Sequence, residues 1–395
     1  MHHFDIYDRP GWNSFTYTFP HWGGIEKRDD GRVVIRFDTA DASTYNDDFY
    51  FRHYQQVAMV SNDGCHTWQP FEPDWPHLMP LRLSDGTLVE VVEERDLVSR
   101  DQQQRRVKDL GIGHVWREDC RLAWDLWPRR MTETLREQGL VVWDRRGSWL
   151  PDDVVATHGP SGFMARRSTD AGRTWVQTPA GSLNDFYHVG PCFPGSVVLP
   201  DDTLLVPFYA MRRNGPPPPR FTLMGAEIHV LRSTDGGCSF QQILVGGAEE
   251  GTHMSEVSLV AHPAGRVVAL IRNPEMLCAW SDDGGLTWTR PRSTGIRDTI
   301  PMDAIGLADG TILCAGAHRP EPGGIRASIS RDAGESWEAT TPIILRDDVP
   351  PSDFIGGPGS VQLDDGSVFT FYNLVRQEAG RKQPHCYIAG SVYTV

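Results

Sequence analysis

The 395-residue sequence lacks the features that mark membrane, secreted and disulfide-rich proteins. It contains no run of about 18 apolar residues, so we expect no membrane-spanning helix. The first residues, MHHFDIYDRPGWNS, have no basic segment followed by an apolar one, and we expect no secretory signal. The seven cysteines are scattered without Cys-x-x-Cys spacing. This pattern predicts free thiols and a cytoplasmic location.

The sequence also has fewer basic residues than acidic ones. Thirty-eight Lys and Arg face 52 Asp and Glu, for a net charge of −14, which disfavours binding to nucleic acid or to an anionic membrane. No group of His, Cys, Asp and Glu has the spacing of metal ligands. The glycine-rich segments lack the strand–turn–helix context of a nucleotide-binding loop. We therefore expect neither a metal nor another cofactor.

The sequence does contain one eight-residue phrase in five near-copies, with the pattern Ser-x-Asp-x-Gly-x-Thr/Ser-Trp/Phe. The copies begin at Ser61, Ser168, Ser233, Ser281 and Ser330. The last three lie 48 residues (233 to 281) and 49 residues (281 to 330) apart, a period typical of propeller blades. Within each phrase, Ser and Asp can bond to the turn's own backbone, and the aromatic residue can pack between sheets. We therefore assign the phrases a structural role.

Six hairpins accompany the five phrases, each formed by two apolar strands around a tight turn. The turns are Asp30-Gly31, Asp85-Gly86, Asp202-Thr203, Ala264-Gly265, Asp309-Gly310 and Asp365-Gly366. Asp-Gly between β-rich runs is a strong hairpin signal. With each hairpin as the inner pair of strands and each phrase as the turn between the outer pair, the sequence predicts an all-β, six-bladed β-propeller. It would form one domain over residues 1–395; a β-sandwich is the alternative, but it would not explain the period.

Two segments depart from the regular pattern. The sixth hairpin is followed by one strand only, so we expect an N-terminal strand, residues 13–19, to complete blade 6 and remove the sheet edges. The gap from Ser61 to Ser168 is 107 residues, which places an insertion at about 96–160 within blade 2. Its segment RRMTETLREQG predicts a short helix that ends at Gly139. A satellite subdomain, a lid and a homo-oligomer contact remain the alternatives for this insertion.

Strand direction predicts which residues meet at the centre of the ring. If the hairpin turns and the phrases share one face, the starts of the first and third strands and the ends of the second lie on the opposite face. That face is rich in Arg, His and carboxylates although the chain is acidic. Clustered arginines on a concave surface are suited to binding a carboxylate.

The phrases match the Asp-box, or BNR, repeat, and together with the hairpins they resemble the sialidase superfamily of six-bladed propellers. The resemblance covers nearly the whole chain apart from the insertion. It implies three carboxylate-binding arginines, a nucleophilic tyrosine polarised by a glutamate, and an aspartate as acid/base. Glu256 and Arg272 have the spacing of the family's glutamate and second arginine, and Arg326 stands where the third belongs. Asp48, or its neighbour Asp47, lies near the acid/base position.

Two positions differ from the family. Thr18 stands where the first arginine is expected, and Gly359 stands in the position of the nucleophilic tyrosine. A glycine cannot act as a nucleophile, so the chemistry must be non-standard. Glu256 is then either a second catalytic carboxylate beside Asp48 or the polariser of another tyrosine, such as Tyr372. The space left by the missing tyrosine could also hold a water for direct inverting hydrolysis.

Three functions fit these residues. The first is an exo-acting glycoside hydrolase that cleaves an acidic sugar from a glycan, with Asp48, Glu256 and Tyr372 as catalytic candidates. Its substrate-binding candidates are Arg272, Arg326, Arg212, Arg319, His188, His318 and Asp303. The second is a polysaccharide lyase in which an arginine neutralises a uronate and a base abstracts the α-proton. The candidates for that base are His188, His253, His318, Tyr209 and Tyr372. The third is a non-catalytic carbohydrate-binding propeller.

Overall fold

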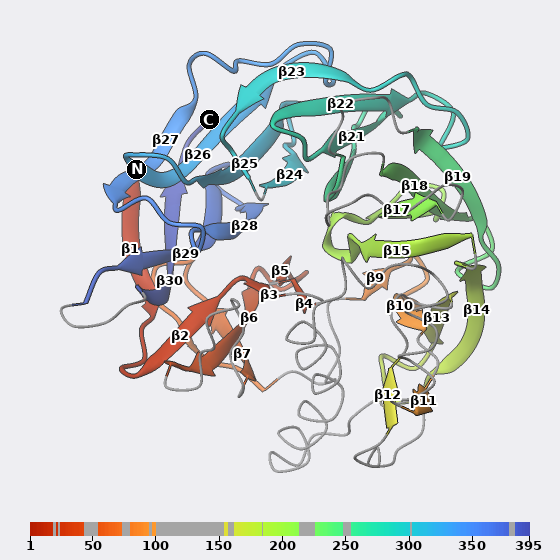
Figure 1. Cartoon of the computed structure of the whole chain (residues 1–395), viewed down its shortest axis with the longest axis horizontal. Coiled ribbons are helices and arrows are strands. Elements are labelled where there is room, and N and C mark those ends of the chain that lie inside the picture. The colour runs from red at the N-terminus through yellow and green to blue at the C-terminus, as the bar shows by residue number, and fades with distance from the viewer. Residues whose placement is uncertain are drawn as a thin grey trace.

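Six antiparallel sheets of four or five strands form a ring in the computed structural model of the chain (Figure 1). The structure describes residues 1–18, 21–22, 24–42, 54–72, 80–94, 97–99, 154–156, 162–183, 185–212, 226–247, 254–300, 302–378 and 384–395. Each sheet is one blade, and the first strand of its inner hairpin lies nearest the ring axis. The six-bladed propeller expected from the repeats is thereby confirmed.

Blades 2, 4 and 5 are each built from four successive strands. Blade 2 contains β9 (Leu81–Arg82), β10 (Leu88–Glu94), β13 (Gly162–Ser168) and β14 (Val176–Ser182). Blade 4 contains β20 (Val257–Ala261), β21 (Val267–Ile271), β22 (Glu275–Ser281) and β23 (Arg292–Arg297). Blade 5 contains β24 (Met302–Gly306), β25 (Ile312–His318), β26 (Gly323–Ser330) and β27 (Ile343–Val349).

In blades 1 and 3 the inner edge consists of two short strands, and both of them pair with the same long second strand. Blade 1 contains β2 (Trp12–Phe15), β5 (Gly24–Lys27), β6 (Val33–Asp41), β7 (Tyr54–Ser61) and β8 (Gln69–Pro70). Blade 3 contains β15 (Phe186–Pro191), β16 (Val197–Val198), β17 (Leu204–Arg212), β18 (Glu227–Ser233) and β19 (Gln241–Gly246), with the 3₁₀ turn η2 (Phe193–Gly195) before β16.

Blade 6 joins the two ends of the chain. It contains β28 (Gly356–Gln362), β29 (Val368–Arg376), β30 (His385–Tyr393) and, as its outermost strand, β1 (His2–Tyr7). The expected closing strand at residues 13–19 is therefore wrong in position. The first half of the nine-residue β6 pairs with β5, and its second half pairs with β2, so residues 12–15 extend the inner edge of blade 1 instead.

Two further strand pairs lie outside the blades. One is β3 (Tyr17–Thr18) with β4 (His21–Trp22), which separates Thr18 from the inner strand β5. The other is β11 (Leu97–Ser99) with β12 (Val154–Ala156), which holds the two ends of the blade 2 insertion together. The helix expected near Gly139 falls outside the described residues. Among the described residues, no helix is long and apolar enough to cross a membrane.

Each Asp box closes its turn with its own side chains. In blade 4 the Ser281 hydroxyl donates to Asp283 Oδ1 at 2.7 Å. Asp283 also accepts from the backbone N–H and the hydroxyl of Thr287, at 2.9 and 2.6 Å. The Thr287 hydroxyl bond and these further donors lower the pKa of the Asp283 carboxyl to about 2. This carboxylate is occupied by the turn, as expected for a structural motif.

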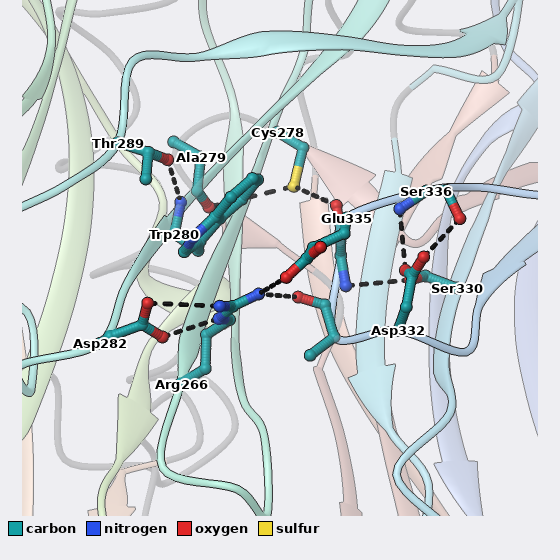
Figure 2. A network of polar contacts seen from close by, with 12 residues as sticks. Arg266, Cys278, Ala279, Trp280, Asp282, Thr289, Ser330, Asp332, Glu335 and Ser336 are labelled. Carbon is teal, nitrogen blue, oxygen red and sulfur yellow. Dashed lines mark hydrogen bonds and ion pairs between the residues drawn. The ribbon is translucent and has the colours of Figure 1, made fainter.

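The boxes of blades 4 and 5 are joined by one arginine, as Figure 2 shows. Arg266 Nε donates to Asp282 Oδ1 at 2.7 Å, and Arg266 Nη1 donates to Glu335 Oε1 at 3.0 Å. The Trp280 ring lies 5.0 Å from the Arg266 guanidinium and 4.2 Å from that of Arg292. Neighbouring blades are thereby tied together on the face that carries the boxes, and the opposite face is left for a ligand.

Candidate functional site

A cavity of about 700 Å³ occupies the centre of the ring. Residues of all six blades line it, and most belong to the inner strands or to the segments that enter them. It reaches from the strand starts at Glu256, Met302 and Gly357 to the hairpin turn of blade 1 at residues 28–32. This volume lies within the range of small-molecule sites. The cavity therefore runs along the ring axis, with its upper end on the face opposite the Asp boxes.

Glu256 and Arg272 form an ion pair at the upper end of blade 4. Glu256 immediately precedes β20, and Arg272 immediately follows β21, so the antiparallel pairing of these strands places them side by side. Arg272 Nη1 lies 2.5 Å from both carboxylate oxygens of Glu256. The Glu256 side chain is 7% exposed, whereas that of Arg272 is 26% exposed. A buried carboxylate thus orients a guanidinium that solvent still reaches.

Asp303 lies on the inner strand of blade 5 and lines the same cavity as Glu256. Its Oδ2 accepts the backbone N–H of Ser360 at 3.0 Å. The Ser258 hydroxyl, which accepts the Ala304 N–H at 3.2 Å, also bonds to the Asp303 carboxyl. Burial raises the pKa of Asp303 to about 7, and these three bonding partners oppose the shift. Asp303 is therefore a carboxyl group that can exchange a proton near neutral pH.

The wall beside Asp303 is formed by residues 357–359 of β28. A Cβ atom at Gly359 would lie 2.5 Å from the Phe371 ring and 3.0 Å from Ile25. The site is therefore packed for glycine, and residue 359 could not carry a tyrosine without moving Phe371. The expectation that a missing side chain leaves room at this position needs correction, because the open volume lies in the channel beside the backbone.

A second charged cluster lines the cavity between blades 1 and 2. Glu90 of β10 accepts from Arg166 Nη1 at 3.4 Å, and Arg36 of β6 lies close enough to lower the pKa of Glu90. Burial dominates, however, and raises that pKa to about 7. Glu90 was not among the residues expected at the site. A signal was present, because a single glutamate interrupts the buried run Leu88–Val91 of the LVEVVEE strand.

His318 and Arg326 lie together on blade 5, away from the cavity lining. His318 Nδ1 bonds to the Asp298 carbonyl at 3.0 Å. Burial, and then the nearby positive charge of Arg326, lower the pKa of His318. Within the described residues, Arg326 Nε has no hydrogen-bond partner. The His318 imidazole and the Arg326 guanidinium are therefore close to each other, as the strand positions indicated.

The structure places three other candidates away from the cavity. Arg319 Nε donates to the Ile355 carbonyl at 3.2 Å, and Arg212 Nε donates to Glu227 at 2.7 Å. Tyr372 is fully buried in the core shared by blades 5 and 6. Its hydroxyl bonds to Ser391, and burial raises its pKa to about 12. Tyr372 is not brought to Glu256 and is poorly placed to act as a nucleophile.

Several candidates lie outside the described residues. Asp47, Asp48 and His253 are among them, as are the side chains of Thr18 and His188. The described residues contain no group of three or more His, Cys, Asp or Glu side chains that could hold a metal ion.

Comparisons with known proteins agree with this architecture. The BNR repeat-like domain family matches residues 153–349. No curated protein sequence matches the chain. A Dyadobacter fermentans protein of unknown function is similar in structure, with a TM-score of 0.66 and 22% identity over 100% of this chain and 98% of that one.

Two sialidase-type enzymes show the same fold at lower identity. The NanB sialidase K499G mutant of Streptococcus pneumoniae has a TM-score of 0.56 and 13% identity over 94% of this chain and 68% of that one. The Ruminococcus gnavus intramolecular trans-sialidase, in complex with oseltamivir carboxylate, has a TM-score of 0.54 and 14% identity over 94% of both chains. At these identities the likeness establishes the fold. With a BNR repeat-like domain over residues 153–349 and a ring of six blades, the chain has the six-bladed β-propeller fold that these sialidase-type structures share.

Proposed function

We propose that the protein is an exo-acting glycoside hydrolase that removes a carboxylate-bearing sugar from a glycan. The Glu256–Arg272 pair carries this proposal: Glu256 lines the central cavity, and Arg272, which is outside that lining, is paired with it. A guanidinium held by a buried carboxylate and still 26% exposed is suited to capturing a ligand carboxylate. Glu256 then acts by positioning Arg272 and balancing its charge.

The relatives support the same substrate class. Two of the similar structures are a sialidase and an intramolecular trans-sialidase. Arg326, beside His318 on the neighbouring blade and outside the cavity lining, is proposed from the resemblance alone as a second cation for the substrate. Asp48 is proposed as the acid that protonates the leaving group, from the resemblance alone.

The proposal requires no cofactor, and its setting is a reducing one. The six described cysteines all carry free thiols. Free thiols are typical of the cytoplasm, which is where we propose that the protein acts.

The test is hydrolysis of a panel of aryl glycosides by the purified chain. The panel includes sialic acids, related keto-deoxy sugars and uronides, each paired with a neutral analogue. We expect release of the aryl group from at least one acidic member and little release from its neutral analogue. An unsaturated product absorbing in the near ultraviolet would instead indicate a lyase, and binding without turnover would indicate a carbohydrate-binding propeller.

A further inference from the structure

We propose that Asp303 is the general base that activates water for direct, inverting hydrolysis, in place of a tyrosine nucleophile. The inference rests on the proposed glycoside hydrolase function and extends it to the reacting atoms. It follows from where the carboxyl group lies, what holds it and what space it faces.

The position of Asp303 in the cavity supports its role as the base. Asp303 lines the central cavity together with Glu256, from the neighbouring inner strand. Its carboxylate accepts the N–H of Ser360, the residue that directly follows Gly359. The Asp303 carboxylate therefore lies beside the backbone segment in which the sialidase resemblance expects a tyrosine. Gly359 itself is closed to any side chain by Phe371.

The two carboxylates, Glu256 and Asp303, differ in their hydrogen-bond partners. Glu256 is engaged by the Arg272 guanidinium through both of its oxygens. Among the described residues, the hydrogen-bond partners of Asp303 are all neutral donors: the N–H groups of Ser360 and Ala304 and the Ser258 hydroxyl. A carboxylate bound to neutral donors can take up a proton at lower cost than one paired with a cation. Of the two, Asp303 is therefore better suited to act as a base.

The cavity in front of Asp303 has room for a water molecule. The cavity of about 700 Å³ is much larger than the space that one water molecule needs, and Gly357, Pro358 and Gly359 line it beside Asp303. The Asp303 carboxyl itself supplies a polar partner that a water in this space can bind. A water beneath the bound sugar would be within reach of the carboxylate.

Hydrolysis then takes place in a single step. The water oxygen forms a bond to the anomeric carbon while the bond from that carbon to the leaving-group oxygen breaks. One water proton passes to Asp303, and a general acid, proposed from the resemblance to be Asp48, gives a proton to the leaving oxygen. The product has the inverted configuration, and both carboxyl groups return to their starting states by exchange with solvent.

The pH dependence follows from the same geometry. The base must be ionised to act, and burial raises the pKa of Asp303 to about 7. Turnover should therefore fall as the pH drops below about 7 and level off above it. A purely structural aspartate would not set this limb of the pH profile.

Two variants test the assignment against a matched control. Asp303→Asn keeps an oxygen acceptor for Ser360, and Asp303→Ala opens space for an external nucleophile. Asp309→Asn is the control, because Asp309 lies in the hairpin turn of the same blade, outside the cavity lining, where it accepts the Thr311 N–H at 2.8 Å. We expect Asp303→Asn to lower kcat about 10²- to 10⁴-fold with little change in KM and without the limb near pH 7. We expect Asp309→Asn to match the wild type.

Product analysis by NMR completes the test. The wild type should release the inverted sugar first, and azide should restore Asp303→Ala by forming an inverted glycosyl azide. A retained first product, or kcat within a few-fold of wild type in both folded variants, would overturn the assignment and leave the hydrolase function standing. If the wild type hydrolyses no member of the panel, the function and the assignment fail together.

Discussion

Replacing Glu90 with glutamine should stabilise the protein above neutral pH. Glu90 is 7% exposed, and burial raises its pKa from the usual 4.5 to about 7. Between these values the folded protein keeps a proton that the unfolded chain has lost, so this group's contribution to stability falls as the pH rises from 4.5 to 7. Above pH 7 the ionised Glu90 costs about 3 kcal/mol, since each pKa unit corresponds to about 1.4 kcal/mol.

Glutamine resembles the neutral acid and avoids this cost. A chain of this length has an unfolding entropy of roughly 0.8 kcal/mol per kelvin, so about 3 kcal/mol corresponds to about 4 °C in Tm. Differential scanning fluorimetry from pH 5 to 8 should show Glu90→Gln close to wild type at the acid end and about 4 °C more stable at pH 8.

The control is Glu338→Gln, because Glu338 is 49% exposed and its ion pair with Arg331 is worth little. Its Tm should follow the wild type at every pH. A difference between Glu90→Gln and wild type that does not change with pH would refute the reasoning, since Glu90 would then titrate alike in the folded and unfolded chains.

Other perturbations test the site and the fold separately. Glu256→Gln should lower kcat/KM for the acidic substrate by no more than Arg272→Ala does, roughly 10- to 150-fold, because it removes the charge that orients Arg272. Asp48→Asn should abolish turnover by removing the acid; circular dichroism should show both variants folded, and wild-type rates in both would make the assignment wrong. Arg266→Ala should lower the free energy of unfolding by about 1–2 kcal/mol, because it removes two exposed ion pairs and a cation–π contact, and an unchanged denaturant midpoint would argue against this tie between blades. Dialysis against a chelator should leave activity unchanged, and a loss restored by a metal ion would contradict the cofactor-free proposal.

The propeller could be predicted from sequence because its signals are local. Each Asp box closes its own turn, as Ser281 and Asp283 do. The motif can therefore be recognised in the sequence without knowing which distant residues it contacts. The closing strand could not be placed in this way. Both β1 and β2 have sequences typical of strands. Their partners are fixed only in the folded ring, where β1 pairs with the edge of β30 and β2 pairs with the second half of β6.

The candidate site shows the same limit. Glu256 and Arg272 could be paired from strand register alone, because the two strands are joined by one short hairpin. The burial of Tyr372 depends on which side of β29 faces blade 5, and the bond from Ser360 to Asp303 crosses between blades 5 and 6. Contacts between residues of different blades depend on how the ring closes, and no local pattern specifies them.

The central claim is that Arg272 captures the carboxylate of an acidic sugar. The most direct measurement is kcat/KM for an acidic aryl glycoside and its uncharged carboxamide analogue, in the wild type and in Arg272→Ala. Arg297→Ala serves as the control, because Arg297 pairs with Glu275 on the same blade and is 69% exposed. Loss of a charge-assisted bond of about 1.5–3 kcal/mol predicts a roughly 10- to 150-fold fall for the acidic substrate and little change for the analogue. An equal loss on both substrates, or no loss on either, would contradict the claim.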